Sequence, residues 1–347
     1  MKNRFVVFFP MIALLVVGSV LKAGDAGNLI VMTHDSFSAS KQAIEHFERE
    51  SGATVRFLKA NDAGAALNQA ILTKSNPMAD LFFGVDNTFL SRALNADIFQ
   101  PYKSALLEHI PEIYQLDRSY RLLAVDFGDV CLNYDKAWFA KRRLAPPSTL
   151  EDLIDPAYRG LTVVENPATS SPGLAFLLTT IGHFGADGFT AYWRSLRDNG
   201  LLVTDSWNNA YWGEFTAASK GTRPIVVSYA SSPPATVFFA ETPLREAPTG
   251  AVLSKGTAFR QIEFVGILKG TEKRETAEKF VDFVLDRKFQ EDMPLQMFVF
   301  PVNRNAKLPK IFADHASIAA DPMKVSYDEI ERNREEWIEM WTEAVLR

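Results

Sequence analysis

Side chains that could bind a small molecule are concentrated at turns that follow predicted strands. In open α/β sheets, ligands bind outside the carboxyl ends of the strands, which is where such turns gather. Each aspartate in these turns could instead cap the helix that follows, a role that Asp fills readily. The residue types alone leave both interpretations open. The turns are 33–37 (THDSF), 60–64 (ANDAG), 84–87 (GVDN), 166–173 (NPATSSPG) and 228–234 (SYASSPP).

Large aromatic residues stand close to a carboxylate in the segment 205–212 (DSWNNAYW). Trp207 and Tyr211 are four residues apart at a predicted helix start, so they share one face of that helix. They could pack in the core, or they could protrude into a cleft and stack on a flat organic cation. Hydroxyls at 169–171 open another predicted helix, an arrangement that suits an anion such as phosphate. Tyr229, at a strand end, could be a core residue or part of a site.

No motif for catalysis or metal binding accompanies these residues. The sequence lacks a G-x-S-x-G elbow, an H-E-x-x-H pair, a P-loop and a G-x-G-x-x-G fingerprint. The single cysteine, Cys131, excludes an internal disulfide and any Cys-rich metal site. The net charge of −5 gives no electrostatic footprint for nucleic acid and mildly favours a cationic or neutral small partner. The sequence therefore favours a binding protein without metal or cofactor over an enzyme.

The first 23 residues have the pattern of a signal peptide. Lys2 and Arg4 precede an apolar run from Phe5 to Leu21, and small residues follow this run. A cleaved signal is the favoured interpretation, and a retained anchor stays open. No cysteine ends the run, so we expect no lipoprotein anchor. We predict that the mature chain works outside the cytoplasm, in the periplasm or an equivalent extracytoplasmic space.

The length of 347 residues favours two domains. Predicted strands alternate with predicted helices over residues 28–84, and the alternation restarts after about residue 130. Such alternation is typical of parallel βαβ units with helices on both faces of a sheet. We therefore expect an α/β fold of two lobes, each a mixed sheet flanked by helices, with the ligand in the cleft between them.

The expected boundaries divide the mature chain into two discontinuous lobes. Lobe 1 is predicted to comprise residues 26–127 and 250–298, and lobe 2 residues 128–249 and 299–347. The chain should cross between them near 125–130, 245–252 and about 300. A capping box at 326–329 (SYDE) predicts the start of the last helix, whose tryptophans are expected to pack in the core.

Several of these segments together resemble a known family. The most specific of them are 33–37, 86–87, 134–136, 169–174 (TSSPGL), 207–211, 228–229 and 232–233. In these segments the chain resembles the periplasmic thiamine-binding proteins of ABC importers, which belong to the two-lobed (type II) extracytoplasmic solute-binding proteins and are related to ferric-ion binders. The resemblance runs from about Leu29 to the C-terminus.

The resemblance implies roles for individual residues. Asp62 and Ser170 would form hydrogen bonds to the ligand, Trp207 would stack on a ring with Tyr211 beside it, and Tyr229 would lie near the cleft floor. His34 occupies a ligand position where the family shows tyrosine, and Phe298 stands where the family has tryptophan. Asp129 is an acid near a family aromatic position. This pocket is therefore expected to be less aromatic and more acidic than the family pattern.

The ligand implied is thiamine, with its phosphates as further possibilities, and the implied partner is a membrane permease to which a monomeric receptor delivers it. Three alternatives stay open. A ferric-ion receptor of this fold usually has two adjacent tyrosines, and Tyr229 is followed by Ala230. A polyamine receptor would also use acids with aromatic residues. An exported hydrolase would need a nucleophile or metal constellation that the sequence does not reveal.

Overall fold

The computed structural model describes residues 27–240 and 242–347, and all statements below refer to this part of the chain. The predicted signal peptide, residues 1–23, lies outside it. The strands are β1 (Asn28–Thr33), β2 (Thr54–Lys59), β3 (Leu81–Asp86), β4 (Phe99–Gln100), β5 (Leu123–Asp135), β6 (Thr162–Glu165), β7 (Leu202–Thr204), β8 (Ile225–Tyr229), β9 (Thr249–Ala251), β10 (Phe259–Leu268) and β11 (Phe300–Pro301). The α-helices are α1 (Lys41–Ser51), α2 (Ala63–Leu72), α3 (Leu90–Asn95), α4 (Lys136–Arg142), α5 (Ser171–Phe184), α6 (Phe189–Asp198), α7 (Pro233–Phe238), α8 (Arg274–Leu285), α9 (Arg287–Gln296), α10 (Lys310–His315) and α11 (Tyr327–Val345).

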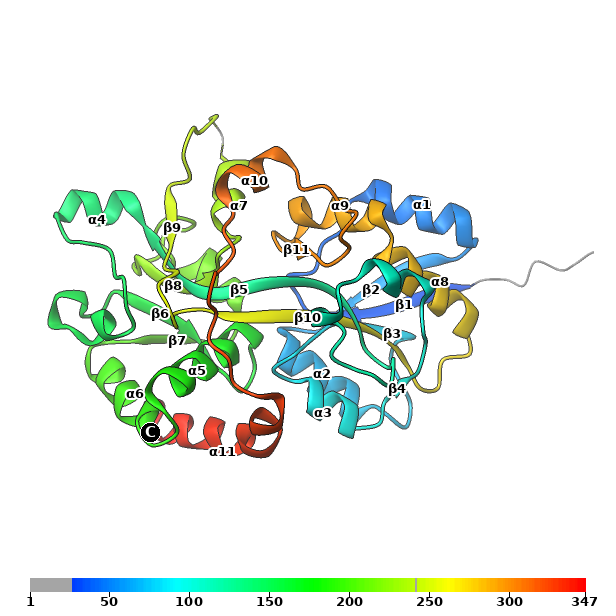
Figure 1. Ribbon diagram of the computed structural model, residues 1–347, viewed down its shortest axis with the longest axis horizontal. Coiled ribbons are helices and arrows are strands. Elements are labelled where there is room, and N and C mark those ends of the chain that lie inside the picture. Colours follow the sequence, from blue (N-terminus) through cyan, green and yellow to red (C-terminus); the bar gives the residue numbers. More distant parts are fainter. Residues whose placement is uncertain (1–26, 241) are drawn as a thin grey trace, which may run out of the picture.

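All of these strands belong to one hydrogen-bonded series, whose main path runs β2-β1-β3-β10-β5-β8-β6-β7. β1, β2 and β3 pair in parallel at one end, and β6, β7 and β8 pair in parallel at the other. We call the part built on β1, β2 and β3 the first lobe and the part built on β6, β7 and β8 the second lobe. The long strands β5 and β10 pair antiparallel and run through the middle of the molecule, connecting both lobes (Figure 1).

The predicted α/β class, with a mixed sheet flanked by helices, is confirmed. The pairing of β10 with both β3 and β5 joins the sheets of the two lobes into one series. One crossing expected from the sequence, near 125–130, lies inside β5. At the crossing expected at 245–252, β9 pairs with residues 133–135 of β5, and β10 then runs alongside both β5 and β3. The residue boundaries of the lobes stay a prediction.

Helices α1 and α2 start at side-chain caps beside the carboxyl ends of β1 and β2. Ser40 accepts a hydrogen bond from the Ala43 amide at the start of α1, which satisfies a donor that the helix cannot pair internally. Asp62 does the same for the Ala63 amide at the start of α2. The caps hold these turns, and the side chains they carry, at the sheet edge where ligands bind.

The last helix, α11, packs against both lobes. The predicted capping box is confirmed, because the Ser326 and Glu329 side chains each bond the other residue's backbone amide. Trp337 and Trp341 are buried, as predicted, and the Trp341 ring meets the edge of Trp193 in α6 at 5.6 Å between centroids. The helix contacts α6 in the second lobe and α3 in the first (Figure 1). None of the helices within 27–240 and 242–347 combines the length and the apolarity needed to cross a membrane.

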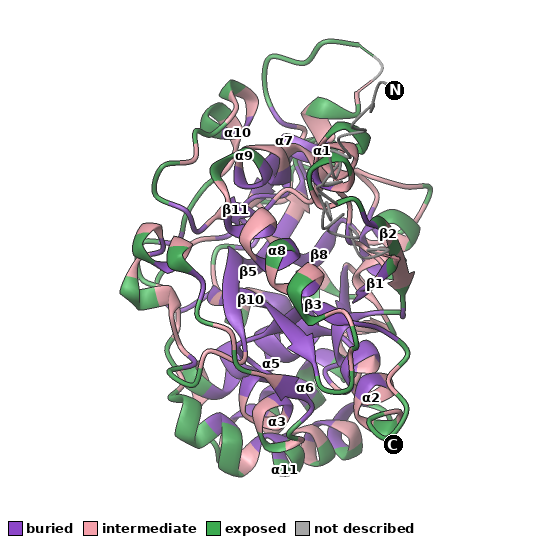
Figure 2. Ribbon diagram, turned by 90° about the vertical axis from the view of Figure 1, so that its right-hand side faces the viewer, coloured by how far each residue is buried: buried purple, intermediate pink, exposed green. Residues whose placement is uncertain are grey.

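The strands in the middle of the sheet are buried on both faces (Figure 2). Strands in such positions normally carry continuous apolar runs. Here buried carboxylates interrupt them, and a cluster of these is formed by Asp86 at the end of β3, Asp126 in β5 and Glu263 in β10. Glu263 stands opposite both of the others in the strand register. Because a buried charge is costly unless it is paired, this acidic cluster indicates a functional site nearby.

Candidate functional site

A cavity lies between the two lobes, where the carboxyl ends of several strands converge. His34 follows β1 and Asp62 follows β2, whereas Ser171 follows β6 and Tyr229 ends β8. The cavity encloses about 670 Å³ of space, its open mouth included. The lining residues are His34, Ser36, Asp62, Ala63, Ser171, Pro172, Trp207, Tyr211, Trp212, Tyr229, Ser232, Ala235, Glu263, Met297, Phe298 and Val299.

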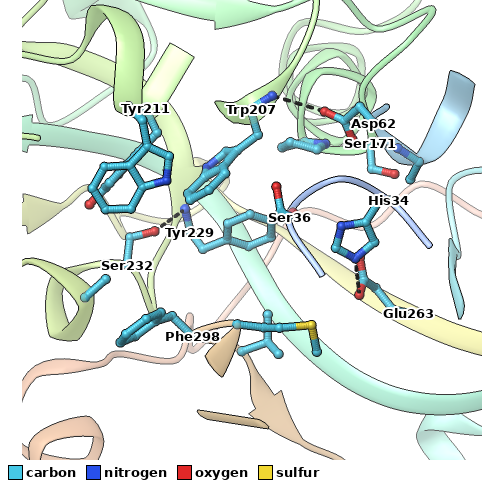
Figure 3. Close-up of a pocket in the computed structure, with 16 residues that line it drawn as sticks. His34, Ser36, Asp62, Ser171, Trp207, Tyr211, Tyr229, Ser232, Glu263 and Phe298 are labelled. Atoms are coloured by element: carbon cyan, nitrogen blue, oxygen red, sulfur yellow. Dashed lines mark hydrogen bonds and ion pairs between the residues drawn. The ribbon is translucent and has the colours of Figure 1, made fainter. Parts of the chain in front are cut away.

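Most of the residues that the sequence predicts as ligand contacts line this one cavity. They come from separate segments of both lobes, and only the fold brings them together (Figure 3). The predicted residues on its wall are His34, Asp62, Trp207, Tyr211, Tyr229 and Phe298. Ser170 and Asp129 do not line it.

Ser170 is fully buried at the position before α5, and its neighbour Ser171 lines the cavity instead. The Ser171 hydroxyl donates a hydrogen bond to the Asp86 carboxylate of the first lobe. The sequence correctly placed a hydroxyl at this helix start, but it could not tell which of the adjacent serines faces the cavity. The helix start that seemed suited to phosphate is thus already faced by a carboxylate of the protein.

Asp129, which the sequence predicts as a ligand-binding acid, forms an internal ion pair and does not line this cavity. Its Oδ1 accepts a hydrogen bond from Arg260 Nε at 2.9 Å, and its Oδ2 accepts one from Arg260 Nη2 at 3.0 Å. The Ala319 amide also donates to Oδ2, at 2.6 Å. The carboxylate is completely buried. Its charge is therefore neutralised by an arginine from β10, which the local sequence around Asp129 could not reveal.

One side of the cavity is an aromatic wall, formed by Trp207, Tyr211, Tyr229 and Phe298 (Figure 3). Trp207 and Tyr211 stack on each other, with ring centroids 4.9 Å apart and planes 17° from parallel. Trp207 Nε1 donates a hydrogen bond to Ser228 Oγ at 2.9 Å, which fixes the indole. Tyr211 is fully buried, whereas Trp207 is half-buried. The sequence left open whether this pair packs in the core or faces the cleft. In the structure, the buried Tyr211 ring packs behind the Trp207 ring, which is the more exposed of the two.

Tyr229, part of the aromatic wall, is held by hydrogen bonds. Its hydroxyl donates to Gln261 Oε1 at 3.3 Å, and its backbone amide donates to Ser232 Oγ at 3.2 Å. A Cβ at Gly128 would lie 2.8 Å from the Tyr229 ring, closer than side chains normally approach. Glycine at this place therefore makes room for the tyrosine.

At the mouth of the cavity, aromatic rings from different segments meet. Phe298, between α9 and β11, lies 5.9 Å from Phe238 and 5.5 Å from Phe239 of the second lobe, measured between centroids. Trp212 meets Phe239 edge-on at 6.3 Å. Phe298 has a φ of 56°, a conformation that costs a non-glycine residue energy and is found preferentially at functional sites. Trp212, Phe238 and Phe239 are exposed to solvent.

The opposite side of the cavity is an acidic wall, formed by His34, Asp62 and Glu263 (Figure 3). Glu263 Oε2 lies 3.6 Å from His34 Nε2, which is an ion-pair distance. Burial opposes protonation of His34, but the negative charges of Glu263, Asp62 and Asp35 outweigh it and raise the His34 pKa. Glu263 is not among the residues predicted from the sequence. The available signal was a lone acid inside the otherwise apolar strand 259–268.

Further carboxyl groups lie behind the acidic wall. Burial raises the pKa of Asp86 to about 6, although Ser171 and Thr88 donate hydrogen bonds to it. Burial, together with the charge of Glu263, raises the pKa of Asp126 well above its ordinary value. The pKa of Glu165 is also raised well above its ordinary value, by burial and by the charge of Asp62. No group of His, Cys, Asp or Glu side chains in residues 27–240 and 242–347 is arranged to hold a metal ion.

Direct hydrogen bonds connect the two lobes across the cavity. Asp62 Oδ1 caps α2, while its Oδ2 accepts a hydrogen bond from the Trp207 amide of the second lobe at 3.1 Å. The Ala65 amide donates to the Thr169 carbonyl at 3.3 Å. The sequence left open whether Asp62 caps a helix or lines the site, and in the structure it does both. The two lobes therefore touch each other across the cleft.

The fold and this cavity define a two-lobed binding protein of the type II periplasmic class. The chain belongs to the family of bacterial extracellular solute-binding proteins, which it matches over residues 76–333. It is 29% identical to the thiamine-binding periplasmic protein of Brucella suis over 98% of each chain. It is 27% identical to the protein of the same name from Escherichia coli, over 92% of this chain and 94% of the relative.

Solved structures agree with this assignment. A periplasmic thiamin-binding protein superposes with a TM-score of 0.82 and 26% identity, covering 92% of this chain and 96% of the other. A periplasmic binding protein of Actinobacillus pleuropneumoniae, solved with fructose-6-phosphate, superposes with a TM-score of 0.76 at 20% identity, over 92% of this chain and 99% of the other. The second likeness concerns the fold alone.

Proposed function

We propose that this protein is an extracytoplasmic receptor that binds thiamine and delivers it to the membrane permease of an ABC importer. The observation that carries the proposal is a cavity with an acidic wall opposite an aromatic wall. No lysine or arginine among the described residues lines it. Such a site suits a flat organic cation. Relatives named as thiamine-binding proteins support thiamine as that cation.

The chemistry of thiamine matches both walls. Its thiazolium carries a fixed positive charge, which the carboxylates of Asp62 and Glu263 would attract more strongly in a closed cleft than in water. Its aminopyrimidine could stack on Trp207, and its exocyclic amine could donate a hydrogen bond to the Asp62 carboxylate. A hydrogen bond to a charged group contributes about 1.5–3 kcal/mol. Cation–π contacts with aromatic faces contribute about 0.5–2 kcal/mol.

The proposal includes how the protein works as a receptor. It would act as a monomer without a cofactor and without catalysing a reaction, in the periplasm after removal of residues 1–23. Its lobes would be residues 26–127 with 250–298 and residues 128–249 with 299–347. These lobes would part to admit the ligand and close over it, breaking and reforming the hydrogen bond between Asp62 and Trp207. The closed form would then be presented to the permease.

Two measurements test the proposed ligand. Native mass spectrometry of freshly purified protein should show a bound mass equal to thiamine or one of its phosphates. Calorimetric titrations should then give a 1:1 complex with thiamine. The matched titrations use thiamine monophosphate, spermidine and ferric citrate. Binding of spermidine or iron with no heat from either thiamine compound would contradict the proposed ligand and leave the receptor fold intact.

A further inference from the structure

His34 occupies a place that the surrounding backbone is shaped to receive. Gly84, within β3, has a φ of 104°, and a Cβ there would collide with the His34 ring. His34 is 9% exposed and lines the cavity. The one polar neighbour given for its buried Nε2 among the described residues is Glu263 Oε2, at 3.6 Å. A buried imidazole held by a single carboxylate beside a cavity can respond to the charge of what enters the cavity.

The charges that face His34 are nearly all negative. Glu263 approaches from β10, Asp62 from the start of α2, and Asp35 from the same turn as His34. Behind Glu263 lie Asp86 and Asp126, opposite it in the strand register. Lys59 is a nearby base, but its Nζ donates to the backbone carbonyl of Asp35 on the exposed side of this turn. His34 is the one residue among those lining the cavity that can carry a positive charge.

On the basis of the proposed function, we propose that His34 and Glu263 form a charge-exchange subsite, in which the cation of the ligand settles beside the carboxylates and expels the proton from His34. The proton leaves His34 Nε2 for solvent, so the positive charge next to Glu263 is exchanged and not added. A like charge within about 4–6 Å disfavours the protonated form of a titratable group. The negative charges around His34 raise its pKa and so favour the protonated form that the exchange requires.

The subsite selects for charge. A cationic ligand replaces the His34 proton as the counter-ion of Glu263, whereas a neutral ligand of the same shape leaves that proton in place. Because the ligand competes with a proton, its affinity should rise as the pH rises through the His34 pKa. The exchange is a property of this chain, since it needs histidine at position 34 and the space provided by Gly84.

Thiamine titrations of the full-length mature protein at pH 7, in buffers with different ionisation enthalpies, test the proposal. The dependence of the observed heat on the buffer gives the number of protons released. We expect wild type to release protons when thiamine binds, because the negative charges around His34 raise its pKa and favour the protonated imidazole before binding. Affinity should improve by about threefold or more between pH 6 and pH 8.

Variants separate the subsite from other effects. His34→Gln retains a polar side chain and should still bind thiamine, but without proton release. Glu263→Gln should reduce the release, since it removes the main charge that keeps His34 protonated. His46→Gln is the matched control, because His46 forms a His–Glu pair at 3.4 Å with Glu50 on the surface of α1. It should release as many protons as wild type.

The outcomes distinguish this inference from the proposed function. Thiamine binding with no buffer-dependent heat would overturn the exchange and leave thiamine as the ligand. Full proton release by His34→Gln would overturn it equally. A wild type that binds no thiamine would overturn the proposed function and the exchange together. A nuclear magnetic resonance titration of the His34 ring provides a second readout, in which thiamine should lower the His34 pKa by about one unit or more.

Discussion

The two walls of the cavity are stabilised in opposite ways. The rings of the aromatic wall stack on each other, and their polar atoms largely have partners: Trp207 donates to Ser228 and Tyr229 to Gln261. The acidic wall places Glu263 and Asp62 in a buried region with further carboxyls behind them, and burial raises the pKa of several of these. The aromatic wall pairs most of its polar atoms without a ligand, the Tyr211 hydroxyl being an exception, whereas the acidic wall and the carboxyl groups near it face a single titratable base, His34.

This difference assigns separate tasks to the walls. A preformed aromatic surface selects by shape and loses little conformational entropy when the ligand binds. A buried excess of carboxylate is costly until a cation enters, so it selects by charge. A ligand that satisfies both walls needs flat rings and a positive charge in one molecule. Single substitutions can weaken one wall at a time, and their effects on binding should differ in size.

Asp62→Asn should have the largest effect, because Asp62 serves the acidic wall and also bonds the second lobe through the Trp207 amide. The carboxylate would be lost both as a counter-charge and as an acceptor for the ligand. Removing a hydrogen bond to a charged group, at about 1.5–3 kcal/mol, corresponds to a loss in thiamine affinity of roughly ten- to a hundredfold. Isothermal titration calorimetry measures it.

Asp129→Asn is the matched control for this variant. It removes a buried carboxylate that lies outside the cavity and pairs with Arg260. Breaking a buried ion pair destabilises by about 3 kcal/mol, so the melting temperature should fall, while thiamine affinity should change by less than about threefold. If Asp129→Asn weakens thiamine binding as much as Asp62→Asn does, then Asp62 is not the main acid that binds the ligand.

Trp207→Ala should weaken thiamine binding by roughly tenfold, since it removes a cation–π or stacking surface from the aromatic wall. Its partner Tyr211 provides the contrast, because that ring is fully buried behind Trp207. Replacing a buried aromatic ring by alanine costs about 3–5 kcal/mol, so Tyr211→Ala should mainly lower the melting temperature. Thermal melts and titrations of both variants check this. Equal losses of stability for the two variants would indicate that Trp207 also acts as a core residue.

Phe239→Ala should weaken binding by about threefold, mainly through faster ligand release. Phe239 is 60% exposed and meets Phe298 across the mouth of the cavity, so it adds apolar contact to the closed form at little cost in core packing. Stopped-flow fluorescence measures the release rate. Leu72→Ala serves as the control, because Leu72 is 84% exposed at the end of α2 and does not line the cavity. An unchanged release rate for Phe239→Ala would show that this ring does not slow the release of the ligand.

Glu165→Gln should leave binding nearly unchanged and affect stability. Burial raises the Glu165 pKa well above 4.5, so the folded state binds a proton that the unfolded state has already released at neutral pH. Stability from this group is therefore present at low pH and lost as pH rises. The neutral amide should stabilise the fold by about 1 kcal/mol at pH 8 and by less at pH 5. Denaturant unfolding at both pH values measures it. An equal gain at both values would exclude proton linkage at Glu165.

The sequence predicted the fold class and most of the cavity because both depend on local patterns. Strand–helix alternation marks βαβ units, and polar residues after strands mark the edge where a site forms. Prediction from the sequence failed where the role of a side chain depends on a partner far away in the chain. Arg260, far along the chain from Asp129, neutralises that acid, and Glu263 reaches the cavity only because β10 passes between β3 and β5. The choice between Ser170 and Ser171 depended on a helix orientation that no local pattern specifies.

The central claim is that one ligand must satisfy both walls, and a comparison of affinities for thiamine and two partial ligands tests it most directly. The neutral aminopyrimidine half of thiamine, as its hydroxymethyl derivative, offers a ring without charge, whereas spermidine offers charge without a ring. Calorimetric titration of the wild-type protein should show thiamine binding at least about a hundredfold more tightly than either partial ligand, a difference of about 2.7 kcal/mol. An affinity for either one equal to that for thiamine would contradict the claim.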